Sequence, residues 1–311
     1  MNLTEKLEQR RFYLYLAISF GIAWATFLAI YLTGGLVDSP LVFPEANVSL
    51  ALLLMAGPVM SAPAIAHLLT RIITREGWQG TRLRPHPARN WRYWAIAWFA
   101  PGILTLAGMA LFFWLFPRYY DPSLSLLQEM LAESAPPTMD LEEINLWYLI
   151  GAQIFQAMLI SPVLNSLATF GEEFGWRAYL QPKLMPLGRR RAYLLTGVIW
   201  GVWHWPAIAM GHNYGFDYPG APITGILMMI WFCITLGILF GWLADRAASV
   251  WPAVIAHGAI NGIAGLGMLF AQGQPNPLLG PMPVGLIGNL GFTIVALALF
   301  FYVIPRETVP S

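Results

Sequence analysis

The chain has 311 residues, of which 57% are hydrophobic and only 11% are charged. Because soluble domains carry about 25% charged residues, this composition excludes an ordinary soluble protein. The net charge of +1 is uninformative by itself, and we expect no nucleic-acid partner. The single cysteine, Cys233, excludes an intrachain disulfide.

Apolar runs recur along the whole chain, and each is long enough to cross about 30 Å of hydrocarbon. They predict an all-α, polytopic membrane helix bundle that forms a single membrane-embedded domain over residues 1–311. The first run lacks a following cleavage site, which favours a retained anchor over a signal peptide. About eight transmembrane helices are expected, at residues 13–33, 49–70, 93–116, 146–170, 192–210, 222–243, 249–271 and 283–304.

The basic residues predict how these spans are oriented. If eight spans alternate, every Lys and Arg in the connecting segments except Arg118 lies on one side of the membrane. Basic residues stay in the cytoplasm, so both termini are predicted to be cytoplasmic. The acidic segment from Asp121 to Glu143 lies on the opposite side, where we expect a solvated loop with a short surface helix.

The stretch GEEFGWRAYL, residues 171–180, places two carboxylates directly after the fourth apolar run. If the helix continues, Glu173 and Arg177 form an i,i+4 pair, and Glu172 is rotated away from them by about 100°. Asn165 lies seven residues before Glu172, so we expect a polar stripe that ends in Glu172. Glu173 is interpreted as structural because Arg177 neutralises it.

Two further polar features lie inside later spans. His204 occurs in WGVWHWPAI, and His257 and Asn261 occur at i and i+4 in AHGAINGI, hence on one face. A lone histidine is usually a satisfied core residue, and a His–Asn pair can simply join helices. However, all three features approach similar depths from the same side, which favours a shared site. His67 is expected at the membrane surface, and His212 outside the depth of the cluster.

Four Gly-xxx-Gly pairs accompany these residues, and such pairs let helix backbones approach closely. They are Gly171/Gly175, Gly197/Gly201, Gly237/Gly241 and Gly258/Gly262.

The ordered motifs resemble the CPBP family, the CAAX-protease and bacteriocin-processing group of intramembrane proteases that includes the Rce1-type endopeptidases. The family signatures are EExxxR, FxxxH and HxxxN or HxxxD. The first and third match this sequence, and the second has Trp200 in place of phenylalanine. The resemblance covers a motif-bearing core at about residues 146–271.

This resemblance implies peptide-bond hydrolysis near the cytoplasmic face. Carried over to this chain, Glu172 would activate the attacking water with help from His204, and His257 and Asn261 would complete the catalytic set. Glu173 and Arg177 would support the end of the helix. A carboxylate in an apolar setting has its pKa raised, which suits a general base. Histidine and asparagine can donate to an oxyanion.

The sequence does not decide between a metal site and a glutamate-driven site. Glu172, His204 and His257 could instead hold Zn²⁺ with one open position for water. No HExxH motif is present. We lean toward a metalloprotease, because two imidazoles and a carboxylate are good ligands.

We expect a multi-pass protein of a prokaryotic cell membrane whose partners are the lipid bilayer and a membrane-protein, prenylated-protein or leader-peptide substrate. One alternative is a non-catalytic bacteriocin-immunity or scaffolding protein of the same fold. A less favoured alternative is an ion-coupled carrier, because no ionisable residue lies deep in the outer half of any span.

Overall fold

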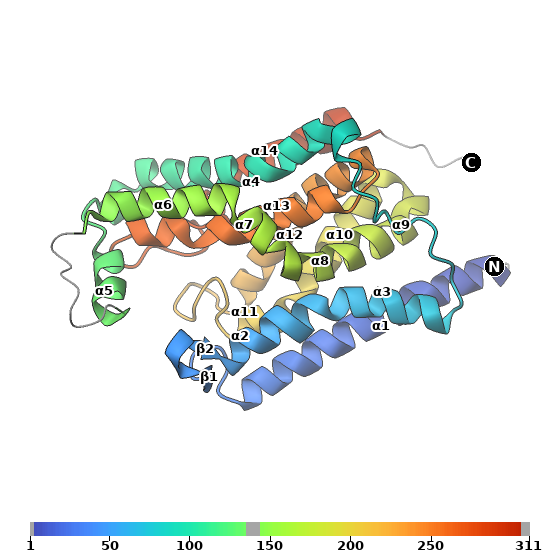
Figure 1. Cartoon of the computed structure of the whole chain (residues 1–311), viewed down its shortest axis with the longest axis horizontal. Coiled ribbons are helices and arrows are strands. Elements are labelled where there is room, and N and C mark those ends of the chain that lie inside the picture. Colours follow the sequence, from blue (N-terminus) through green and yellow to red (C-terminus); the bar gives the residue numbers. More distant parts are fainter. Residues whose placement is uncertain (1–2, 135–143, 306–311) are drawn as a thin grey trace.

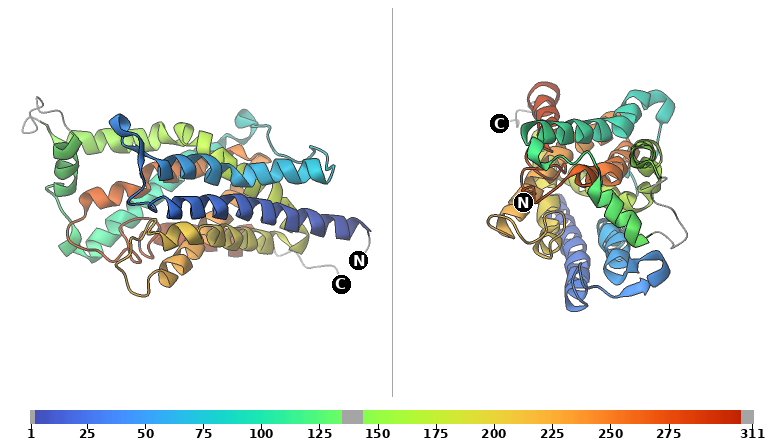
Figure 2. Two further views of the ribbon diagram at one scale, coloured as in Figure 1. Left: turned by 90° about the horizontal axis from the view of Figure 1, so that it is seen from below. Right: turned by 90° about the vertical axis from the view of Figure 1, so that its left-hand side faces the viewer.

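The computed structural model describes residues 3–134 and 144–305 as a bundle of helices with one small hairpin (Figures 1 and 2). Five helical segments are long and apolar enough to cross a membrane: Thr4–Leu32, Leu50–Ile73, Pro87–Leu115, Ile223–Ala247 and Trp251–Phe270. The protein is therefore an all-α, multi-pass integral membrane protein, as the composition predicts.

The helices of the first half precede the motifs. They are α1 (Leu3–Leu32), α2 (Leu50–Leu54), the π-helical turn η2 (Met55–Val59), α3 (Met60–Ile73), α4 (Pro87–Leu115) and α5 (Ser125–Ser134), with short 3₁₀ turns η1 (Pro44–Ala46) and η3 (Pro117–Tyr119). A hairpin of β1 (Leu41–Phe43) and β2 (Val48–Ser49) joins α1 to α2.

The second half carries the motifs. Its helices are α6 (Leu146–Leu159), α7 (Ser161–Leu164), α8 (Ser166–Gly175), η4 (Trp176–Leu180), α9 (Gln181–Leu184), η5 (Met185–Leu187), α10 (Arg189–Trp203), α11 (Trp205–Ala209), α12 (Ile223–Ala247), α13 (Trp251–Ile263), η6 (Ala264–Phe270), α14 (Leu290–Ala298) and η7 (Leu299–Val303).

Each of the eight predicted spans coincides with helical structure, but three of them are shorter or broken. The apolar helices at 146–159 and 290–303 are too short by themselves for a full crossing. The fifth predicted span consists of α10 and α11, which are separated at His204. The exact number of crossings, and which side each end faces, therefore stay predictions.

Proline explains two of the breaks. Pro162 and Pro206 lie at the first turns of α7 and α11, where the missing proline N–H costs no hydrogen bond. Each proline therefore starts a new helix. Pro101, in contrast, lies inside α4 without breaking it, whereas the backbone of α4 is kinked at Asn90. The breaks bend the backbone at the level of the motifs.

The fourth apolar run does not end where the sequence suggested. Helical structure continues from α8 through η4 and α9 to Leu184. Glu172 is only 3% exposed, and Glu173 and Arg177 are 0% exposed. The two carboxylates are therefore buried inside the bundle rather than exposed at the end of the fourth apolar run. Glu173 and Arg177 likewise do not hold a helix end, because the helix continues past both of them.

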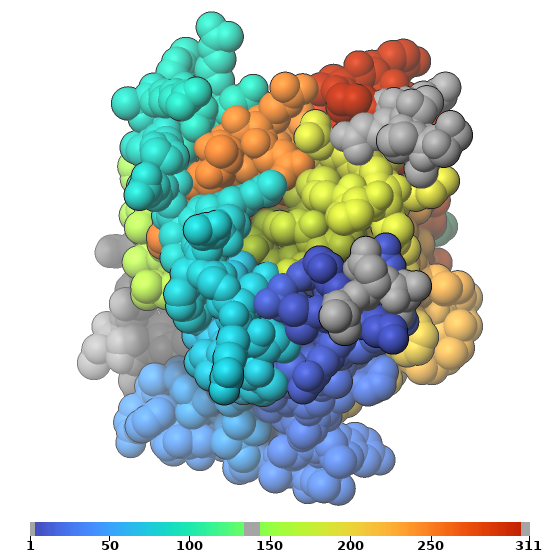
Figure 3. Space-filling view, turned by 90° about the vertical axis from the view of Figure 1, so that its right-hand side faces the viewer, coloured from blue at the N-terminus to red at the C-terminus, as the bar shows by residue number. Residues whose placement is uncertain are grey.

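Charged residues from several connections form ion pairs at one end of the bundle. Figure 3 shows the surface of that end, coloured by sequence. The Lys183 ammonium binds the carboxylates of Glu8, at 2.7 Å, and Glu76. On the same end, Arg82 pairs with Asp245. These contacts link the start of α1, the connection between α3 and α4, the α9 region and the end of α12. That grouping matches the side on which the sequence predicts the basic residues.

The described part of the acidic segment lies at the opposite end of the bundle, where α5 is the expected short helix (Figure 1). Asp121 receives hydrogen bonds from the amide and hydroxyl of Ser123 and of Ser125, and its own amide donates to Phe270 O at 2.9 Å. These contacts fasten the chain after α4 to the end of η6. Asp140, Glu142 and Glu143 of this segment lie outside the described residues.

The predicted Gly-xxx-Gly pairs all lie at close contacts. An added Cβ at Gly171 would lie 2.5 Å from Met60 O, and one at Gly258 would lie 2.7 Å from Pro162 O. Such distances are too short for any side chain, so these glycines allow α8 to cross α3 and α13 to cross α7.

Candidate active site

A cavity of about 340 Å³ is lined by residues from each of the three motifs. Glu172, His204, His257 and Asn261 all line it, although they come from α8, the α10–α11 break and α13. The structure thus places the four candidate catalytic residues around one space. Their catalytic roles stay predictions.

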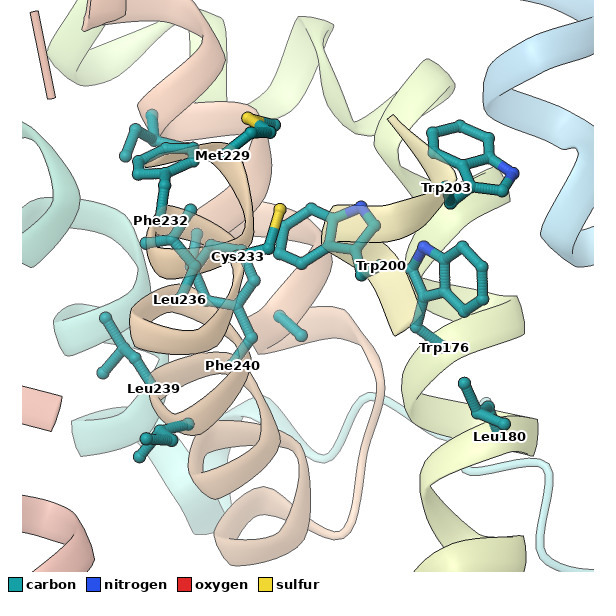
Figure 4. Close-up of a cluster of buried hydrophobic side chains, with 14 of the residues drawn as sticks. Trp176, Leu180, Trp200, Trp203, Met229, Phe232, Cys233, Leu236, Leu239 and Phe240 are labelled. Atoms are coloured by element: carbon teal, nitrogen blue, oxygen red, sulfur yellow. The ribbon is translucent and has the colours of Figure 1, made fainter. Parts of the chain in front are cut away.

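Two tryptophans hold the Glu172 carboxylate. The Trp200 indole N–H donates to Glu172 Oε2 at 2.6 Å, and the Trp176 N–H donates to the same oxygen at 3.4 Å. Figure 4 shows both indoles among the buried side chains, with Trp200 between α12 and Trp176. Because both donors bind Oε2, Oε1 is the oxygen available for a water in the cavity.

Glu173 connects the first and third motifs. Its Oε1 accepts from His257 Nδ1 at 2.9 Å, and its Oε2 lies 3.2 Å from Arg177 Nε. The predicted pair of Glu173 with Arg177 is therefore confirmed. The link to His257 was not predicted, and it fixes the orientation of that imidazole with Nδ1 protonated.

The Arg177 guanidinium is fully buried and stacks on aromatic rings. Its Cζ lies 5.0 Å from the centre of the Trp200 ring and 5.7 Å from that of Phe240. Such cation–π contacts stabilise a desolvated arginine. Together with Glu173, they explain how a cation can lie inside the bundle.

The polar stripe of the fourth helix differs from the one expected. Asn165 Nδ2 donates to Gly258 O at 2.9 Å, and Thr169 Oγ1 donates to Val254 O at 3.0 Å. The stripe continues one i+4 step further to Glu173. Glu173 binds His257, which lies on α13 like Val254 and Gly258. Glu172 does not end this stripe, because it points instead toward Trp200 on α10.

His204 lies where the backbone bends between α10 and α11. Its Nδ1 lies 2.8 Å from Trp200 O, which accepts the bond, so Nε2 keeps its lone pair. The His204 ring centre is 5.9 Å from that of Trp200, and the His257 ring centre is 5.3 Å from it. Trp200 therefore contacts four groups of the site: Glu172, Arg177, His204 and His257. No pattern of spacing in the sequence predicted this.

Two histidines outside the motifs differ from expectation. His212 lines the same cavity together with Asn213, because the loop after α11 folds back toward the site. Burial lowers the pKa of His212. His67 is fully buried rather than exposed at a surface, and it binds Phe174 O at 2.9 Å and Arg71 Nε at 2.6 Å.

Glu172, His204 and His257 are the three side chains that could hold a zinc ion in the cavity. Two imidazole nitrogens and a carboxylate are suitable donors for Zn²⁺. Yet within residues 3–134 and 144–305 no three His, Cys, Asp or Glu side chains lie close enough to hold one ion. Glu172, His204 and His257 are therefore not assembled as a metal site, and we derive no step through a metal.

Comparison with known proteins finds similarity in the motif-bearing segment. Residues 146–263 match the family model described as type II CAAX prenyl endopeptidase Rce1-like. A curated protein named CAAX prenyl protease 2, from the archaeon Methanococcus maripaludis, is 32% identical over 105 residues. That similarity spans 32% of this chain and 38% of the relative.

Proposed function

We propose that this protein is an intramembrane endopeptidase, because residues 146–263 match the model of the Rce1-like CAAX endopeptidases. The observation that carries the proposal is the single cavity lined by Glu172, His204, His257 and Asn261. The four side chains come from three parts of the chain, namely α8, the α10–α11 break and α13. Structural hydrogen bonds alone would not require them to share an open space.

The proposed reaction is attack of water on a peptide carbonyl carbon. The Glu172 carboxylate removes a proton from the water as the new carbon–oxygen bond forms. His204 orients the water through its Nε2 lone pair. When the carbon–nitrogen bond breaks, Glu172 returns the proton to the leaving amine, so that protons balance over the cycle. The indole donors keep Glu172 in one orientation throughout.

His257 and Asn261 would stabilise the oxyanion. The Asn261 amide can donate directly, and His257 can donate from Nε2 when its ring carries a second proton. Glu173 Oε1 lies 2.9 Å from His257 Nδ1 and holds the imidazole in place beside the cavity. Removing one such donor typically lowers kcat by about 10²- to 10³-fold.

We propose a membrane-associated polypeptide as the substrate, cleaved on the cytoplasmic side of the bilayer. A prenylated C-terminus, a leader peptide and a membrane-protein segment all belong to this class. Zinc is the cofactor that the same donors could take if the side chains moved together. Elemental analysis of the purified protein, together with activity in the presence of chelator, separates that arrangement from glutamate-driven hydrolysis.

The test compares membrane peptides after incubation with the purified protein in lipid vesicles. New peptide ends should appear with the natural sequence and disappear with Glu172→Gln or His204→Ala. Glu129→Gln provides the matched control, because this exposed carboxylate lies on α5, away from the cavity. Equal cleavage by Glu172→Gln and Glu129→Gln would refute the proposal.

A further inference from the structure

The end of α10 leaves four backbone carbonyl groups without partners in their own helix. α10 ends at Trp203, and the last four carbonyl groups of an α-helix receive no hydrogen bond from within it. Here they belong to residues 200–203. Pro206, in the first turn of α11, has no N–H with which to continue the ladder. At membrane depth such groups are satisfied by neighbouring parts of the protein, so each carbonyl should have a donor.

His204, the residue at the break, covers three of the four carbonyls itself. Its backbone N–H contacts the oxygens of Gly201 and Val202. Its imidazole Nδ1 lies 2.8 Å from the oxygen of Trp200, which accepts the bond. The orientation of the imidazole is therefore tied to the geometry of the turn that ends α10. Any movement of this turn would also move Nε2, the nitrogen that orients the water in the proposed reaction.

The fourth carbonyl, that of Trp203, accepts a hydrogen bond from another helix. The donor is the indole N–H of Trp24 on α1, at 3.2 Å. One turn later on α1, Phe27 is 1% exposed and places its ring edge-on to that of Trp203, with 6.3 Å between the ring centres. α1 therefore holds both the main chain and the side chain of the residue directly before His204.

Trp24 itself lies at the surface of the bundle, where it is 39% exposed. In a membrane-spanning protein that surface faces hydrocarbon, which offers the indole N–H no water. The bond to the Trp203 carbonyl thus satisfies a donor and an acceptor at once. Removing only the donor would leave the carbonyl unsatisfied in an apolar setting, which favours a rearranged turn.

The other proline break has an equivalent bond. α6 ends at Leu159, shortly before Pro162, and the carbonyl of Met158 is among its last four. The indole N–H of Trp98 on α4 donates to this oxygen at 2.9 Å. Trp98 is not among the side chains that line the cavity of the candidate active site. The two bonds are thus alike in chemistry, and of the two it is the bond of Trp24 that adjoins a candidate catalytic residue.

We propose that Trp24 is a positioning residue for His204. By fixing the Trp203 carbonyl, it holds the turn that orients the imidazole, so that Nε2 stays directed at the attacking water. The inference rests on the proposed function, in which His204 orients that water. Trp24 lies outside residues 146–263, so the segment that matches the family depends on a helix that precedes it.

Nuclear magnetic resonance tests the positioning without requiring cleavage. Benzothienylalanine, which has the shape of tryptophan but sulfur in place of the indole N–H, replaces Trp24 in the Glu172→Gln protein. The same replacement at Trp98 is the matched control. Histidine is isotope-labelled, and the His204 signals are those absent from the His204→Ala protein. Replacement at position 24 should shift the His204 imidazole signals, whereas replacement at position 98 should leave them unchanged.

Two results of this measurement would overturn the inference. One is a set of His204 signals that stays unchanged after replacement at position 24. The other is an equal shift from both positions, which would indicate general loosening of the bundle. Because no cleavage is measured, neither result depends on whether the chain is a protease.

Kinetics on a cleaved membrane peptide test the consequence for the reaction. Benzothienylalanine at position 24 should lower kcat by about 2- to 13-fold, the range expected for loss of one neutral hydrogen bond, with KM nearly unchanged. At position 98 it should leave kcat close to the natural value. Equal losses of kcat at both positions, or a loss confined to KM, would contradict positioning. A natural protein that cleaves nothing would refute the proposed function, while the His204 signals would still decide the inference about Trp24.

Discussion

Trp200 provides the sharpest test of how the base is held. Its indole N–H donates to Glu172 Oε2 at 2.6 Å in a buried setting. Trp200→Phe keeps an aromatic ring, as the second family signature does, but removes this donor. A hydrogen bond to a charged group contributes about 1.5–3 kcal/mol, which corresponds to about 13- to 160-fold in rate if the whole effect falls on the base.

Two other tryptophans at the site, Trp176 and Trp203, provide matched control variants for Trp200→Phe. Trp176 donates to the same carboxylate oxygen at 3.4 Å, which makes a weaker bond. Trp203 is equally buried and lines the cavity, but its indole nitrogen has no hydrogen-bond partner in the described part of the chain. The losses should therefore follow the order Trp200→Phe, then Trp176→Phe, then Trp203→Phe.

The assay measures kcat and KM on one cleaved membrane peptide, with thermal unfolding in detergent as the control for folding. Positioning of the base predicts that kcat falls while KM changes little. If Trp200→Phe and Trp203→Phe lose activity equally, aromatic packing rather than the N–H donor matters at position 200. The reasoning about Glu172 would then be refuted.

Three further outcomes are expected. Gly171→Val should destabilise the fold or prevent expression, because its Cβ would lie 2.5 Å from Met60 O; a normal unfolding temperature would contradict the tight crossing. The hydroxyls of Ser123 and Ser125 lower the pKa of Asp121, so its stabilisation is present above the unfolded value of about 3.9 and is lost as pH falls through the folded value. Asp121→Asn should accordingly cost about 1–3 kcal/mol at neutral pH, and unfolding titrations should show this difference shrinking in acid; a constant difference would refute the assignment. Purified protein should hold well under one metal per chain and remain active in chelator, whereas stoichiometric zinc would favour the metal arrangement.

The sequence predicted the helices well because length and hydropathy decide them. The predicted spans at 13–33, 93–116 and 222–243 correspond to α1, to the part of α4 after its kink at Asn90, and to α12. The fourth and fifth spans were less accurate, since Pro162 and Pro206 start new helices within them. In soluble and membrane helices alike, whether a proline breaks a helix depends on its neighbours, as the uninterrupted helix around Pro101 shows.

For the candidate site, the sequence predicted a contact within one helix but not the contacts between helices. Spacing alone predicted that Glu173 pairs with Arg177, because i and i+4 face each other in any helix. The bonds of Glu172 to Trp200 and of Glu173 to His257 could not be predicted, since they depend on how separate helices rotate about their axes. The inclusion of His212 in the cavity depends on a loop that folds back, and the sequence has no periodic signal for such a loop.

The partners of the two adjacent carboxylates explain how both can be buried. Burial of an unpaired charge is costly. Glu173 has a partner at each oxygen, since Arg177 Nε lies 3.2 Å from Oε2 and His257 Nδ1 lies 2.9 Å from Oε1. Glu172 has separate partners, because the indole N–H groups of Trp200 and Trp176 donate to its Oε2. The two carboxylates therefore share no partner, which leaves Glu172 Oε1 directed to the chemistry proposed for the cavity while Glu173 holds α8 against α13.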